Sequence, residues 1–194
     1  MNRGRIAGAL AALLLVSLPA HAYIRKVFPV KDLIRDADSI TTVKIDALDP
    51  SKPSMTLSFD RNLKGKAPFE KIDVDMTGEA EKGPWPSGEL QKRLAPGLTV
   101  VVFGNPKGTA QARFKHHLFL YTNGTWFQIA AIEPKDGGPL YWKYRNCEPY
   151  LRRTFKGTTE EMRQTVLDGL LGKKEPPAFD PDEKEGLGPV VEKK

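Results

Sequence analysis

The chain has 194 residues, of which 40% are hydrophobic, and its formal net charge is +6. This length and this apolar fraction are typical of one globular domain with a tail. Lysines and arginines are spread among aspartates and glutamates along the whole chain, which argues against nucleic-acid binding and leaves solubility as the main effect of the charge.

The start of the chain has the features of a cleavable bacterial export signal. Arg3 and Arg5 precede an apolar stretch, residues 6–18, and Ala20 and Ala22 supply small residues at the two positions that a signal peptidase reads. The stretch is shorter than the roughly 20 apolar residues that cross a bilayer, so a retained anchor is the less favoured alternative. The sequence predicts cleavage after Ala22 and a periplasmic or secreted protein without an integral membrane segment.

The next part of the chain predicts one short helix and three strands. Apolar residues with helical spacing predict a helix over residues 30–37. Residues 40–47 are rich in Thr, Val and Ile, which is typical of a strand. Residues 55–60 and 71–76 alternate apolar with polar side chains, so each predicts a strand with one solvated face.

After a loop over residues 77–86, the pattern predicts a further pair of strands. Residues 89–94 are expected to form one or two helical turns, and the apolar run 98–103 predicts a central strand. Residues 112–121 predict a long strand, with one side formed by Phe114, His116, Leu118 and Leu120.

The strongest local signal is the dipeptide Asn123-Gly124. It lies between the strand just described and a sixth one that includes residues 126–129. Asn and Gly both tolerate the positive φ angles of a tight type I′ turn, so these two strands are expected to form a hairpin.

The C-terminal third differs in composition. Residues 136–174 begin with aromatic residues and arginines and then predict a helix, because Thr158 and Glu161 have capping-box spacing and Gly172 precedes two prolines. The expected apolar face of this helix consists of Met162, Val166, Leu170 and Leu171. The helix is expected to dock on its own barrel, with docking on a partner as the alternative. Residues 175–194 are rich in Pro, Gly and charge and are predicted to be disordered.

Five or six short strands joined mainly by turns predict a mainly β (α+β) fold. The expected form is a small antiparallel OB-like barrel over residues 23–135, with a short N-terminal helix and a C-terminal helix. Closure of the sheet would remove its exposed edges.

The order of these elements resembles the OB-like, netrin-like domain of tissue inhibitors of metalloproteinases. It also resembles small exported bacterial proteins in which a segment such as Ala37-Asp38-Ser39-Ile40 precedes a strand and Leu63-Lys64-Gly65 ends the next one. The resemblance covers roughly residues 33–132. Those inhibitors place an N-terminal cysteine on the zinc of their target, whereas the processed chain would begin with Tyr23, so protease inhibition does not carry over.

Three groups of residues that often carry chemistry have simpler interpretations here. His116 and His117 are neighbours on a strand and point to opposite faces, which argues against a shared metal. Asp73 and Asp75 share a face near Asp60, but solvated strand faces have the same pattern. Cys147 is the single cysteine and has no intramolecular disulfide partner, so a buried thiol is favoured over a reactive or intermolecularly bridged one. No metal or cofactor is predicted.

One cluster is singled out for binding. It consists of Tyr141, Trp142, Tyr144, Arg145, Tyr150, Arg152 and Arg153. Aromatics and arginines are enriched at recognition hot spots, although the same residues can form the seam between barrel and C-terminal helix.

The preferred hypothesis is an exported, non-catalytic binding module of the bacterial periplasm or cell envelope, whose partner is an envelope protein or an acidic glycan. Two alternatives remain open. One is a hydrolase that uses Asp60, Asp73, Asp75 and a histidine, and the other is a structural envelope component that dimerises through Cys147.

Overall fold

The computed structural model describes residues 28–77, 86–107 and 114–188. The predicted export signal, most of the predicted loop 77–86 and the beginning of the predicted strand 112–121 lie outside the described residues, as do residues 189–194 of the tail. The described elements follow the chain in the order α1 (Val30–Asp36), β1 (Ser39–Asp49), β2 (Ser54–Lys64), β3 (Lys71–Asp75), α2 (Ser87–Gln91), β4 (Thr99–Gly104), β5 (His116–Thr122), β6 (Thr125–Ile132), β7 (Tyr141–Cys147), η2 (Pro149–Arg153) and α3 (Thr159–Leu170).

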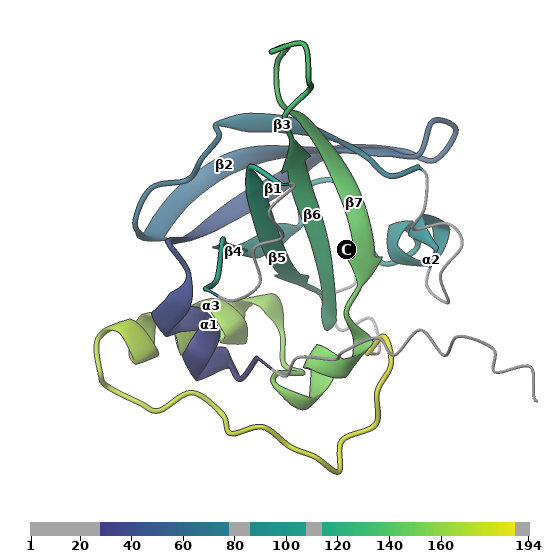
Figure 1. The fold of residues 1–194 in the computed structure, drawn as a ribbon. Coiled ribbons are helices and arrows are strands. Elements are labelled where there is room, and N and C mark those ends of the chain that lie inside the picture. Colours follow the sequence, from purple (N-terminus) through teal and green to yellow (C-terminus); the bar gives the residue numbers. More distant parts are fainter. Residues whose placement is uncertain (1–27, 78–85, 108–113, 189–194) are drawn as a thin grey trace, which may run out of the picture.

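The strands form one closed barrel in the order β1-β2-β3-β7-β6-β5-β4, with β4 returning to β1 (Figure 1). All neighbouring pairs are antiparallel except β3 and β7, which run parallel and pair through Val74 with Trp142 and Asp75 with Lys143. The predicted fold class is confirmed, since the barrel is compatible with an OB-like one and carries a short N-terminal and a C-terminal helix. Among the described residues the strands number seven, not five or six.

The additional strand is β7, in the aromatic and arginine segment that the sequence patterns set apart from the barrel. Its burial alternates, because Trp142 and Tyr144 are buried while Lys143 and Arg145 are only partly so. The period of two was therefore present in the sequence. The mixture of positive charge and large aromatics concealed it, because the residues that face away from the interior carry the charges.

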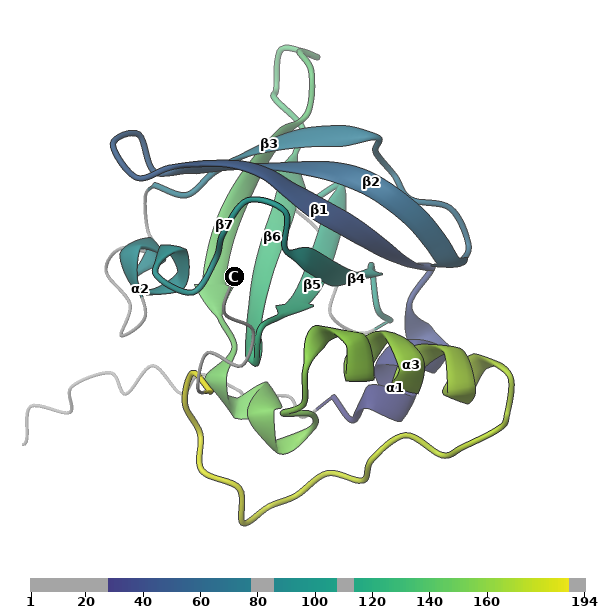
Figure 2. The same cartoon turned by 180° about the vertical axis from the view of Figure 1, so that it is seen from behind.

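Two hydrophobic clusters use opposite faces of the same strands. Val100 and Val102 of β4 belong to the cluster inside the barrel, whereas Val101 and Phe103 belong to a second cluster outside it, with residues of α1, η2 and α3. Both faces of β4 are covered, which explains why its sequence is a continuous apolar run. Figure 2 shows α1 and α3 together beneath the β4 and β5 end of the barrel.

The predicted hairpin and the predicted helix start are confirmed, and they contact each other. Asn123 and Gly124 have φ angles of 49° and 72°, and Thr122 pairs with Thr125 across the turn. The backbone N–H of Asn123 donates to Thr159 Oγ1 at 3.0 Å, which ties the hairpin to the first residue of α3. The hairpin thus fixes where α3 begins relative to the barrel.

The capping box of α3 is complete, but its apolar face is shorter than predicted. Thr158 accepts from the backbone of Glu161, and the Glu161 carboxylate accepts from the backbone of Thr158. Met162 and Val166 are buried, whereas 65% of Leu171 is exposed. Leu171 is the C-cap residue and follows the last helical residue, so it lies past the end of the face that the barrel covers. Leu170 is likewise exposed.

Beyond α3 the chain turns back and passes beneath the helices to η2, where the yellow part of Figure 1 ends. Composition predicts disorder for residues 175–194. In the structure, residues 180–188 make specific contacts with η2 and with Arg93, which follows α2. None of the helices among the described residues has the length and apolar character needed to cross a membrane.

Candidate functional site

The aromatic members of the predicted cluster mostly belong to the core. Trp142 and Tyr144 point into the barrel, and Trp142 stacks on His116 with ring centroids 5.9 Å apart. Tyr150 is buried in the outer cluster. Tyr141, with 44% of its surface exposed, is the aromatic residue of the predicted cluster that remains open to solvent. Trp142 and Tyr144 therefore belong to the interior of the barrel, and Tyr150 lies in the seam between the barrel and the C-terminal helix.

Arg145 is separated from the other two arginines. Its guanidinium carbon lies 5.0 Å from the centre of the Phe114 ring, a cation–π arrangement on the outer face of the barrel. The structure therefore does not bring all three predicted arginines to one place.

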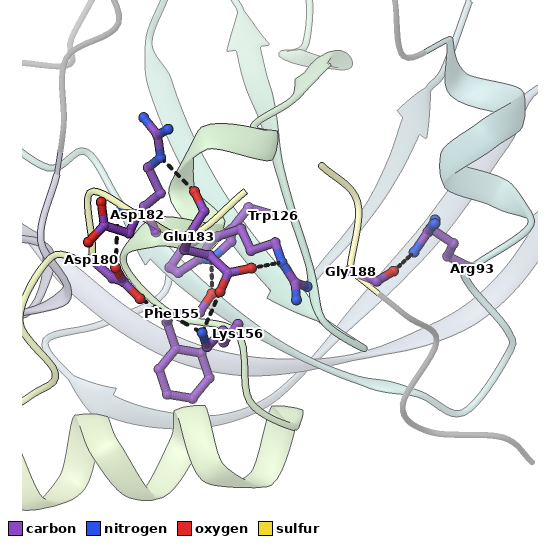
Figure 3. Close-up of polar contacts among 10 residues, drawn as sticks. Arg93, Trp126, Phe155, Lys156, Asp180, Asp182, Glu183 and Gly188 are labelled. Carbon is purple, nitrogen blue, oxygen red and sulfur yellow. Dashed lines mark hydrogen bonds and ion pairs between the residues drawn. The ribbon is translucent and has the colours of Figure 1, made fainter. Parts of the chain in front are cut away.

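The other two arginines lie together on η2 and meet the C-terminal segment. We call residues 180–188 the acidic strap, and Figure 3 shows the contacts of Asp180, Glu183 and Gly188. Arg152 Nε donates to Glu183 Oε1 at 2.8 Å, and Arg153 Nε donates to the Glu183 carbonyl oxygen at 2.9 Å. Lys156, just beyond η2, donates to the second carboxylate oxygen of Glu183. One glutamate is thus held by three basic residues.

The electrostatics of Glu183 follow from this arrangement. Only 16% of its side chain is exposed. Hydrogen bonding to Lys156 and then to Arg152 lowers the pKa of its carboxyl below the ordinary value, because both donors favour the charged form. The site is therefore built for a carboxylate that stays ionised.

Further contacts continue along the strap on both sides of Glu183. Arg153 Nη1 lies 3.3 Å from Glu185 Oε1, and the backbone N–H of Asp180 donates to the Arg153 carbonyl at 2.8 Å. The Gly186 N–H donates to the Pro149 carbonyl at 3.3 Å. These bonds hold the strap against η2.

The end of the strap reaches the mouth of the barrel. Leu187 packs against the interior cluster, and Arg93, after α2, donates to the carbonyl oxygen of Gly188 (Figure 3). Sequence reasoning did not select Arg93, Lys156, Glu183 or Glu185. The available signal was charge complementarity between a basic turn and an acidic tail, but the sequence alone does not show that the two meet.

A cavity of about 580 Å³ lies next to these contacts, between the chain from η2 to α3 and residues 174–180. Arg153 and Lys156 line it on one side, and Glu161 and Asp168 of α3 line it on another. Its lining mixes both signs of charge with Phe155, so the cavity by itself selects no ligand chemistry.

The three carboxylates of the hydrolase hypothesis have ordinary local partners. Asp73 accepts a hydrogen bond from Thr56, and Asp75 pairs with Lys143 at 3.3 Å. Asp60 accepts from Thr42 at 2.7 Å, and it lies four residues along β2 from Thr56, or about 13 Å at strand spacing. The structure does not bring the three together.

His116 points to the opposite side of the barrel wall from Asp73 and Asp75. Val74 points into the barrel, so its neighbours Asp73 and Asp75 point outward, whereas His116 packs on the inward-facing Trp142. His117 faces the outer cluster, where its ring lies 5.2 Å from that of Phe119. The predicted divergence of the two histidines is present, and the described residues contain no group of three or more His, Cys, Asp or Glu that could hold a metal.

Cys147 lies inside the barrel, with 3% of its surface exposed. The Tyr144 hydroxyl donates to its sulfur at 3.3 Å. Burial raises the pKa of the thiol to about 11, since it disfavours the thiolate. A disulfide to a second chain would require the barrel to open.

A buried polar chain on the outer face was not expected from sequence. His117 Nε2 and Gln128 Oε1 are 2.6 Å apart, and Gln128 Nε2 donates to Glu148 Oε1 at 2.5 Å. Asn146 donates to the same oxygen of Glu148, and the other carboxylate oxygen, Oε2, is buried as well. Burial raises the pKa of Glu148 to about 8. No motif in the sequence marks this glutamate, which follows Cys147 directly.

The chain matches no protein-family model, no curated protein and no solved structure. The geometry of the described residues is therefore the basis for any functional conclusion.

Proposed function

We propose that this protein is an exported, non-catalytic binding module of the bacterial periplasm or cell envelope, and that it holds an acidic polypeptide on the basic turn formed by Arg152, Arg153 and Lys156. The single observation that carries the proposal is the environment of Glu183, whose carboxylate is bound by Arg152 and Lys156 and whose carbonyl is bound by Arg153.

The chemistry of the basic turn supports a carboxylate ligand. Hydrogen bonds between guanidinium or ammonium groups and a carboxylate are shorter and stronger than neutral ones. Two cations within reach of one carboxylate also lower its pKa, as they do for Glu183. A surface that binds one glutamate in this way is suited to acidic side chains of a partner.

The arrangement of the other contacts supports a polypeptide. Backbone groups of η2 at Pro149 and Arg153 bond to backbone N–H groups of the strap at Gly186 and Asp180. Main-chain hydrogen bonds of this kind are typical of the recognition of a polypeptide.

The test is hydrogen exchange on the processed protein, with and without poly-L-glutamate. We expect slower exchange of the amides in residues 150–157 when the polymer is bound, and no change with poly-L-lysine. A variant with Arg153→Gln and Lys156→Gln serves as the matched control, since these partly exposed residues are replaced by polar side chains of similar length.

Two results would contradict the proposal. One is equal protection in the control variant, which would place the binding elsewhere. The other is protection by a sulfated oligosaccharide but not by poly-L-glutamate, which would make the partner a glycan.

A further inference from the structure

We infer that the acidic strap is a built-in competitor for the proposed partner, and that its sequence defines what the partner must look like: a peptide with two acidic residues that have one residue between them, followed by glycine, an apolar residue and glycine. This inference rests on the proposed function of the basic turn. It goes further because it names the peptide motif and the segment that regulates access.

The first part of the motif comes from the two acidic contacts. Glu183 meets Arg152 and Lys156, and Glu185 meets Arg153. Lys184, between them, is exposed to solvent. Glu183 and Glu185 therefore reach the same basic surface, while the residue between them faces solvent.

The second part comes from Gly186, Leu187 and Gly188. The φ angle of Gly186 is 155°, where a side chain is strained, so a residue other than glycine fits poorly. Leu187 is partly buried against the barrel's interior cluster. A Cβ atom at Gly188 would clash with Arg152 Nη1 and would lie 2.9 Å from the Gly124 carbonyl oxygen. These three positions therefore require glycine, then an apolar residue, then glycine.

The strap is an imperfect ligand, which makes it displaceable. Arg152 Nη1 is buried and has no hydrogen-bond partner, although its Nε is bonded to Glu183. A buried N–H without an acceptor costs free energy. Since only the backbone of Gly188 lies beside this group, the strap leaves it unpaired, and this cost weakens the binding of the strap.

Because the strap is part of the same chain, it competes at a high effective concentration. A tethered segment near its site commonly acts as if present at millimolar concentration. The apparent affinity for an external peptide is the intrinsic affinity multiplied by the fraction of molecules whose site is free. Weakening the strap should therefore tighten external binding without any change in the basic turn.

The experiment uses the full processed chain with Glu183→Gln and Glu185→Gln, which keeps the length of the strap and removes its two carboxylates. The probe is a fluorescent synthetic peptide with the sequence of residues 180–188, Asp-Pro-Asp-Glu-Lys-Glu-Gly-Leu-Gly. We expect the variant to bind the peptide at least about 10-fold more tightly than the wild-type chain does. A control peptide with both glutamates replaced by glutamine should bind neither protein, and hydrogen exchange of the strap amides should be faster in the variant.

Equal affinity of the wild type and the variant would overturn the competitor and leave the proposed function standing. Unchanged exchange of the strap in the variant would overturn it as well, because the two carboxylates would then not hold the strap. If the strap is released but its peptide does not bind, while poly-L-glutamate still does, the motif is wrong and the basic turn retains its function. If neither probe binds the variant, both proposals fail.

Discussion

The buried carboxyl of Glu148 differs in protonation between the folded and the unfolded protein. It accepts hydrogen bonds from Gln128 and Asn146 on one oxygen, and a hydrogen bond from Tyr150 also favours the charged form. Burial outweighs these hydrogen bonds and raises the pKa of Glu148 from 4.5 to about 8. Near neutral pH the folded protein holds a proton on Glu148 that the unfolded chain releases.

This proton makes the stability of the barrel dependent on pH. Between pH 4.5 and about 8 the folded state binds one proton more than the unfolded state, so the free energy of unfolding falls as the pH rises through this window. The slope from this group is at most about 1.4 kcal/mol per pH unit. In Glu148→Gln, which mimics the protonated form, we expect this slope to vanish and the stability at pH 8 to exceed that of the wild type. Urea unfolding at several pH values measures both.

The control for Glu148 is Glu160→Gln at the exposed start of α3, where the pKa is lowered by its hydrogen bond to Arg163. This variant should keep the wild-type slope above pH 5. If the free energy of unfolding of Glu148→Gln depends on pH as steeply as that of the wild type, the Glu148 carboxyl is already ionised in the folded protein.

Cys147 gives a second prediction for a single residue. The thiol is buried, and burial raises its pKa to about 11, so the reactive thiolate is scarce at neutral pH. We expect alkylation by a maleimide at pH 7.5 to be slow in the folded protein and to become fast in urea at the unfolding transition. The protein should also run as the same species on gels with and without reductant. Rapid labelling or a reductant-sensitive dimer in the native state would contradict the burial.

Among the elements, α3 depends on its first turn. The capping box at Thr158 and Glu161 satisfies two backbone N–H groups at the start of the helix, and the hairpin at Asn123 bonds to Thr159 beside it. Below this turn Met162 and Val166 are fully buried against the outer face of the barrel. Loss of the cap should therefore weaken the first turn, while the later residues of the helix stay packed on the barrel.

Thr158→Ala should lower the free energy of unfolding by about 1 kcal/mol, because the side-chain acceptor of the cap is lost. Thr158→Ser retains the hydroxyl and should remain close to the wild type. In urea unfolding, the expected result is a lower midpoint with an unchanged m value. A loss of equal size in both variants would assign the effect to packing of the threonine methyl group and not to the cap.

At the scale of the whole molecule, charge organises the surface of the C-terminal third. The basic residues on and next to η2 face a segment with acidic residues at positions 180, 183 and 185. The barrel itself is held by two apolar clusters that share its wall. The strap and the barrel should therefore respond differently to acid.

The pKa of Glu183 is lowered in the folded protein, so its contribution is present above the ordinary pKa of glutamate and is lost as the pH falls through the lowered value. Glu148 stays protonated throughout this acidic range and does not weaken the barrel there. We expect the strap to detach on acidification below about pH 4.5 before the barrel unfolds. The amide resonances of Gly186 and Gly188 report the strap, and those of Val101 and Phe119 report the barrel. Simultaneous loss of both sets would contradict a separate strap.

The sequence by itself determined the β-rich class and most local structure. Alternation along residues 55–60 and 71–76 predicted two strands, Asn123-Gly124 predicted the hairpin, and Thr158 with Glu161 predicted the start of α3. Each depends on neighbours within a few positions, through strand periodicity, positive φ angles or a cap. Such local rules do not depend on where the rest of the chain lies.

Tertiary structure decided what short-range patterns do not contain. Only the closed barrel shows that β7 pairs with both β3 and β6, which places Trp142 and Tyr144 in the core and removes them from the candidate surface. Arg152 and Arg153 were selected from sequence, but their acidic counterparts lie about 30 residues further along the chain. Contacts of this kind depend on the path of the chain in space, because a charge or an aromatic ring has the same local sequence whether the fold buries it, pairs it or leaves it exposed.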